Sequence, residues 1–170
     1  MARLLILRHA KSSWKDAGLA DHDRPLAPRG RKAAKVMAEH LSTERPAPEL
    51  VLCSSARRTR ETLERIAPGL GQEVAVRIEP ELYAASAQRL LERLRAVEDG
   101  VESVLLIGHN PGLEELAISL VASGSKLAAI KRKYPTGALA TLEFAGRWRD
   151  MQPRSAELRD FVTPKQLAKG

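Results

Sequence analysis

Short apolar runs that alternate with amphipathic segments constrain the fold of this chain more than any other feature. The runs Arg3–Leu7, Leu50–Cys53 and Ser103–Ile107 are almost continuously aliphatic and have polar residues on both sides, which is typical of strands buried on both faces. This alternation predicts an α/β fold, a three-layer α/β/α sandwich with a mostly parallel central sheet. Further strands are expected at Val74–Ile78, Ala138–Phe144 and Glu157–Val162. Helices are expected over Pro28–Leu41, from Ser54–Ser55 through about Ile66, over Gln88–Val97 and from Leu113 to about Val121.

The length of 170 residues fits one domain that spans residues 1–170. No internal repeat, linker or sustained heptad pattern divides the chain. The first apolar run, Leu4–Leu7, is too short for a signal sequence or a membrane-spanning helix. We therefore expect a cytoplasmic protein that does not bind membranes.

The net charge of +7 is unevenly distributed along the chain. Residues 1–60 carry 13 Lys and Arg against 6 Asp and Glu, so the whole surplus lies in the first third. Such a surplus fits a nucleic-acid or membrane patch, a cationic pocket for a compact anion, or solvated helix faces. Aromatic residues make up only 4% of the chain, which argues against a base-stacking surface, and we expect no nucleic-acid partner.

Three of the predicted strands end in unusual polar residues. Arg8 and His9 follow the first strand, the stretch from Ser54 to Arg58 follows the second, and His109 follows the strand that ends at Ile107. Ligands of open α/β sheets bind at the carboxyl ends of the strands, so these side chains are expected to meet at one edge. A neutral imidazole is a competent nucleophile toward phosphorus, and guanidinium groups neutralise phosphoryl oxygens. The pattern therefore points to phosphoryl transfer.

These segments resemble three motifs of a known family. Leu7-Arg8-His9-Ala10-Lys11-Ser12-Ser13-Trp14 is similar to the Arg-His-Gly signature of the histidine phosphatase superfamily, in the Arg-His-Ala form of its SixA-like branch. Ser54 to Thr62 resembles the second motif, with Arg58 at the phosphate-binding position, and Gly108-His109-Asn110-Pro111-Gly112 resembles the block that carries the second histidine. Asp23-Arg24-Pro25-Leu26, Arg29-Gly30 and Glu81-Leu82-Tyr83 are also similar to this branch.

The resemblance implies a phosphoglycerate-mutase-like fold and a metal-independent phosphatase without a cofactor. His9 would attack phosphorus and carry a phosphohistidine, Arg8, Arg58 and His109 would hold the phosphoryl oxygens, and water would release inorganic phosphate. Lys11, Ser12 and Ser13 follow the nucleophile and are candidates for the substrate-binding rim of the pocket.

One departure from the family concerns the general acid. Larger members use an acidic residue two positions after a Leu that follows the third strand, and counting from Leu82 puts Ala84 there. An alkoxide leaving group needs a proton in the transition state, whereas an imidazole nitrogen is a better leaving group. This favours phosphohistidine or another activated phosphate over phosphosugars, and the expected substrate is protein phosphohistidine. The alternatives are a small-molecule phosphomonoesterase and a phosphate-dependent binding protein with little turnover.

The remaining conspicuous residues are expected to have other roles. Arg57 and Arg60 are expected to be surface or docking charges, and Trp14 either a wall of the site or a packing residue of its loop. Cys53 is expected to be a small buried hydrophobe. His22 and His40 are expected to be structural or exposed, and Lys131-Arg132-Lys133 is expected to be a solvated turn with docking to an acidic protein as an alternative.

Overall fold

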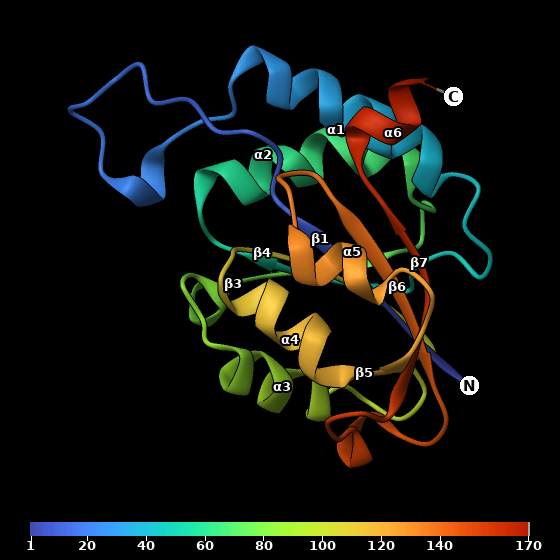
Figure 1. The fold of residues 1–170 in the computed structure, drawn as a ribbon. Coiled ribbons are helices and arrows are strands. Elements are labelled where there is room, and N and C mark those ends of the chain that lie inside the picture. The colour runs from blue at the N-terminus through green and yellow to red at the C-terminus, as the bar shows by residue number, and fades with distance from the viewer. Residues whose placement is uncertain (170) are drawn as a thin grey trace.

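A computed structural model describes residues 1–169, so the last residue of the predicted domain, Gly170, lies outside the described part. The chain forms a seven-stranded sheet flanked by six helices (Figure 1). The strands are β1 (Ala2–Arg8), β2 (Leu50–Ser54), β3 (Ala75–Glu79), β4 (Ser103–Gly108), β5 (Val121–Ser123), β6 (Leu139–Phe144) and β7 (Ala156–Val162). The helices are α1 (Pro28–Leu41), α2 (Arg57–Ile66), α3 (Ala87–Arg95), α4 (Gly112–Leu120), α5 (Leu127–Arg132) and α6 (Pro164–Lys169).

The sheet has the order β3-β2-β4-β1-β6-β7-β5. Four of its six strand pairs are parallel, and only the pairs of β6 with β1 and with β7 are antiparallel. The predicted mostly parallel sheet is therefore confirmed. The non-sequential order places β1 and β4 side by side near the centre, although about a hundred residues separate them.

Alternate residues of each central strand enter two separate cores, one on each face of the sheet. Leu4 and Ile6 of β1 pack with α3, α4 and α5, while Leu5 and Leu7 pack with α1 and α2. Figure 1 shows the same arrangement, with α1, α2 and α6 over one face and α3 and α4 over the other. The predicted three layers are confirmed.

The structure differs from the sequence prediction toward the C-terminal half and at one sheet edge. The helix expected to reach Val121 ends at Leu120, and the chain enters the short strand β5. Lys131 and Arg132 end helix α5, so the predicted turn is wrong there, although both side chains are exposed. In the described part of the chain, the strand β3 lies at the edge of the sheet, and its Val76 and Ile78 side chains are exposed.

Candidate active site

Strand register brings the two candidate catalytic histidines together. Arg8 of β1 and Gly108 of β4 are partners in the parallel ladder, so the residues that follow them, His9 and His109, leave the sheet side by side. The backbone N–H of His9 donates to the Gly108 carbonyl at 3.1 Å. The two imidazole centroids are 5.3 Å apart. The convergence predicted from the strand ends is thus present in the structure.

The surroundings of His9 fix its tautomer and its charge. Its Nδ1 lies 2.7 Å from the Ala10 carbonyl oxygen, an atom that only accepts hydrogen bonds, so Nδ1 carries a proton and donates it. The lone pair of Nε2 remains free. Burial, opposed by this hydrogen bond and reinforced by Arg58 and Arg8, lowers the pKa of His9 from 6.5 to about 4. At neutral pH the ring is therefore uncharged, as a nucleophile requires.

His109 has the opposite pattern of free and bonded nitrogens. Its Nε2 lies 2.7 Å from the Ser54 hydroxyl oxygen, and that oxygen also accepts the Ala56 N–H at 3.3 Å. When the Ser54 hydroxyl donates to Nε2, the hydroxyl hydrogen has an acceptor and its oxygen still accepts the Ala56 N–H, and the ring proton then resides on Nδ1. Nδ1 is buried and has no protein partner in the described part of the chain. His109 can therefore present an N–H to a bound oxyanion.

The charge of His109 is controlled by the same environment. Burial, followed by the neighbouring His9 and Arg58, lowers the pKa of His109 to about 3. A neutral ring at physiological pH can donate one hydrogen bond without adding charge.

Three arginines surround the imidazoles and differ in what they contact. Arg58, from the first turn of α2, donates to the Asp21 backbone carbonyl at 2.8 Å and to its carboxylate at 3.0 Å. Arg24 donates to the same carboxylate at 3.0 Å. Arg8 donates one bond to the Tyr134 carbonyl at 3.0 Å, and its Nε is buried without a partner in the described residues. Arg8 thus keeps a donor that a ligand oxygen can accept.

Asp21 is the carboxylate of this site, and it is ionised. The Tyr83 hydroxyl donates to it at 2.5 Å, and Arg58 and Arg24 donate as well. The Tyr83 bond first, and then the two guanidinium groups, lower the pKa of Asp21 to about 2 despite some desolvation. A carboxyl group that is deprotonated across the physiological range is not equipped to protonate a leaving group. It acts as an electrostatic partner of the arginines.

Ala84 is the residue that the family resemblance puts at the position of the general acid. Ala84 adopts a left-handed backbone conformation with φ of 55°. Glu81, the nearest acidic residue in the sequence, is exposed and does not line the cavity described next. Asp21 is therefore the acidic residue of the described chain that this cavity contains.

The two histidines, the three arginines and Asp21 line one cavity of about 340 Å³. Of the three predicted rim residues, Lys11 and Ser12 line it, whereas Ser13 does not and instead accepts a bond from Arg24 Nε through its carbonyl at 3.1 Å. Trp14 forms a wall of the cavity, with the Arg24 guanidinium carbon 3.1 Å from its ring centroid. The complete lining is Arg8, His9, Lys11, Ser12, Trp14, Asp21, Arg24, Arg58, His109, Asn110 and Thr136.

The sequence interpretation missed several residues of this cavity. Arg24 and Asp21 come from the long segment between β1 and α1, where no strand end marks them. The resemblance of Asp23-Arg24-Pro25-Leu26 to the SixA-like branch was the available signal for Arg24. His22 is nearer the site than expected, because its ring packs edge-to-face on Tyr83 with centroids 4.8 Å apart. It does not line the cavity.

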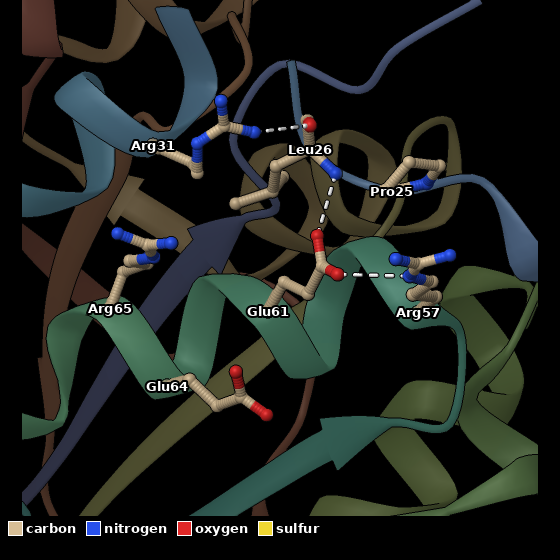
Figure 2. A pocket seen from close by; sticks show the side chains of 7 residues that line it. All are labelled: Pro25, Leu26, Arg31, Arg57, Glu61, Glu64 and Arg65. Atoms are coloured by element: carbon tan, nitrogen blue, oxygen red, sulfur yellow. Dashed lines mark hydrogen bonds and ion pairs between the residues drawn. The ribbon is translucent and has the colours of Figure 1, made fainter. Parts of the chain in front are cut away.

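The segment that carries Arg24 is hydrogen-bonded to helix α2 through Leu26, as Figure 2 shows. The carboxylate of Glu61 accepts the Leu26 backbone N–H at 2.8 Å and the Arg57 Nε–H at 2.9 Å. Arg31 donates to the Leu26 carbonyl at 3.2 Å. Because Glu61 and Arg58 are on the same helix, this contact holds Arg24 and Arg58 in a fixed relation across the cavity.

Residues 1–169 contain neither a metal-binding cluster nor a membrane-spanning helix. Their His, Cys, Asp and Glu side chains do not gather in groups of three or more that could hold a metal ion. None of their helices has the length and apolar composition needed to cross a bilayer.

Comparison with known proteins places these observations in a family. The model of the histidine phosphatase superfamily (branch 1) matches residues 4–84. An uncharacterised protein of Mycobacterium tuberculosis is 40% identical over 163 residues, which cover 94% of this chain and 100% of that protein. Phosphohistidine phosphatase SixA of Escherichia coli is 32% identical over 111 residues, 64% of this chain and 68% of that protein.

A solved structure agrees with this assignment over almost the whole chain. A candidate phosphohistidine phosphatase SixA from Nakamurella multipartitia matches with a TM-score of 0.85 and 31% identity, covering 96% of each chain. The chain therefore belongs to the histidine phosphatase superfamily. The predictions of a phosphoglycerate-mutase-like fold and of a SixA-like phosphatase that acts on a phosphorylated substrate are confirmed.

Proposed function

We propose that this phosphatase transfers a phosphoryl group from protein phosphohistidine to His9 and then to water. The observation that carries the proposal is the pair of neutral imidazoles, 5.3 Å apart, that share one cavity with Arg8 and Arg58. Their separation allows a phosphoryl group attached to one ring to contact the other. The cationic side chains neutralise the equatorial oxygens while phosphorus changes partners.

The two steps follow from the hydrogen bonds of the site. His9 Nε2 forms a bond to phosphorus as the bond from phosphorus to the substrate nitrogen breaks, and the leaving nitrogen takes a proton from solvent. The Ala10 carbonyl holds the opposite ring nitrogen and stabilises the positive charge that develops on His9. His109 Nδ1–H and Arg8 donate to the phosphoryl oxygens. Water then attacks phosphorus, the bond to His9 breaks and inorganic phosphate leaves.

The choice of substrate rests on the missing acid. Among the described residues, Asp21 supplies the one carboxyl group that lines the cavity, and its pKa of about 2 keeps it deprotonated. Ala84 stands at the position that the resemblance assigns to the family's acid. A sugar or alkyl oxygen would have to leave unprotonated, at a cost in rate of about 10²–10⁴ relative to a site with a general acid. A phosphorylated imidazole has a better leaving group. The name of the similar Escherichia coli protein, phosphohistidine phosphatase, supports the same substrate class.

Single-turnover kinetics and phosphate trapping test the proposal. A peptide with one phosphorylated histidine and a simple alkyl phosphate are each mixed with excess enzyme, and the enzyme is quenched and mapped by mass spectrometry. We expect faster hydrolysis of the peptide and a transient phosphate on His9. The His9→Ala variant is expected to fold, to lose turnover and to trap no phosphate, whereas His40→Ala keeps both. Equal rates for the two substrates would contradict the substrate assignment, and turnover by His9→Ala would contradict the nucleophile.

A further inference from the structure

A second and larger cavity, of about 720 Å³, lies beside the candidate active site between α1 and α6. Figure 1 shows these two helices next to each other on the same face of the sheet. Lys11 and Thr136 line both this groove and the active-site cavity, so the two spaces adjoin. We call this space the α1–α6 groove. Its lining is Lys11, Arg29, Lys32, Ala33, Val36, Lys133, Pro135, Thr136, Thr163, Pro164, Lys165 and Ala168.

The α1–α6 groove carries a surplus of positive charge. Of the twelve lining residues within the described part of the chain, five are Lys or Arg and none is acidic. All five basic residues are exposed, and within residues 1–169 none of their side chains makes an ion pair or a hydrogen bond. Elsewhere exposed cations such as Arg147 and Arg149 contact carboxylates. A set of unpaired like charges lowers the stability of the fold and attracts anions.

The rest of the lining indicates what kind of anion fits. Ala33 and Val36 of α1, Pro135, and Pro164 and Ala168 of α6 are apolar, so cations and apolar side chains lie together in one groove. None of the lining residues is aromatic, which disfavours the stacking of nucleic-acid bases. A polypeptide segment that carries both acidic and aliphatic side chains complements both properties.

We propose that the α1–α6 groove binds an acidic segment of the phosphorylated protein on which the active site acts. This inference rests on the proposed function, because it assigns a docking surface to the same substrate. Since Lys11 and Thr136 are shared by the two spaces, a segment in the groove continues directly to the phosphorylated residue in the active site. The groove thus selects acidic protein substrates, while the active site performs the chemistry.

Two synthetic peptides of equal length provide the probe. Each has a single histidine, phosphorylated with phosphoramidate, and they differ only in the flank, which holds four Glu and two Leu in one and four Gln and two Leu in the other. We expect the wild-type enzyme to hydrolyse the acidic peptide with a kcat/KM about fivefold or more above that of the neutral one at low salt, from several exposed charge pairs. The preference is expected to shrink as salt is added.

Charge-reversal variants locate the effect. Lys32→Glu and Lys165→Glu lie in the groove and outside the active-site cavity, and each is expected to remove most of the preference for the acidic peptide. Arg89→Glu makes the same charge change at an exposed position of α3, on the other face of the sheet, and is expected to keep the preference. Hydrolysis of the neutral peptide is expected to stay unchanged in all three.

Binding measured without turnover separates this inference from the proposed function. The unphosphorylated acidic peptide, labelled with a fluorophore, is titrated with each variant and followed by anisotropy. Weaker peptide binding by Lys32→Glu, together with unchanged binding by Arg89→Glu, supports docking in the α1–α6 groove. This result is independent of which phosphate compound the enzyme hydrolyses fastest. Equal hydrolysis of both peptides by the wild type, an unchanged preference in the groove variants, or tighter binding of a single-stranded oligonucleotide than of the acidic peptide would each overturn the inference.

Discussion

The two neutral imidazoles make the stability of this protein depend on pH in a window that can be calculated. His9 is only 6% exposed, and burial lowers its pKa from 6.5 to about 4. Between these two pH values the unfolded chain binds a proton at His9 that the folded chain does not, so the free energy of unfolding decreases as the pH falls. At about 1.4 kcal/mol per pH unit, this interval predicts a loss of about 3 kcal/mol from His9.

Urea unfolding at several pH values between 7.5 and 4.5 measures this loss. We expect the His9→Gln variant to lose about 3 kcal/mol less stability than the wild type as the pH falls through this range. His40→Gln, a substitution on α1 outside the cavity, is the control and is expected to follow the wild type. Inorganic phosphate is expected to reduce the wild-type loss, because an anion among Arg8, Arg58 and the imidazoles favours the protonated rings. Parallel curves for wild type and His9→Gln would refute a neutral, desolvated His9.

Three further substitutions probe the site and its support. Arg58→Ala is expected to remove about 3 kcal/mol of transition-state stabilisation, seen as a roughly hundredfold lower kcat with a small phosphorylated substrate; a loss confined to KM would contradict that role. Ser54→Ala removes the hydroxyl that fixes the tautomer of His109 and leaves Nε2 without its partner, at a cost of about 1–3 kcal/mol in thermal unfolding together with a lower kcat. Gly30→Ala places a methyl group 2.1 Å from the Lys11 carbonyl oxygen, so we expect a loss of about 1–3 kcal/mol in urea unfolding, and unchanged stability would show that α1 can shift.

The central sheet and the histidine pair could be predicted because both follow from local sequence. Aliphatic runs such as Leu4–Leu7 have no stable place except between two helical layers, and parallel strands end at the same edge of a sheet. His9 and His109 therefore had to lie near each other once β1 and β4 were adjacent. The pairing of Arg8 with Gly108 in the parallel ladder then determines that the two histidines leave the sheet at the same level.

The residues that sequence reasoning missed are held by contacts between distant segments. Arg24 and Asp21 lie in a segment whose path is set by the bonds of Leu26 to Glu61 and of Ser13 to Pro25. Such bonds leave no periodic signal in the sequence, because they depend on how the segment meets α2. The strand β5 was missed for another reason, since its three residues are too few for a recognisable alternation.

The structure shows where the surplus of basic residues among the first 60 residues lies. Three of these basic residues, Arg8, Arg24 and Arg58, surround the imidazoles. Their charge is partly balanced by the ionised Asp21. A phosphoryl group that enters therefore shares Arg24 and Arg58 with Asp21, whereas Arg8 Nε has no protein acceptor in the described part of the chain.

This difference predicts the order in which the donors act. Arg8 and His109 Nδ1–H offer donors that no protein group occupies among residues 1–169, so they are suited to capture the incoming phosphoryl oxygens. Arg58 is paired with the carboxylate of Asp21, so part of its charge is already neutralised when the phosphoryl group arrives. Removing the competitor by Asp21→Asn is then expected to tighten inhibition by vanadate, a tetrahedral phosphate analogue, and to leave the tautomers of the two histidines unchanged. Weaker inhibition would show that Asp21 orients Arg58 more than it competes with the ligand.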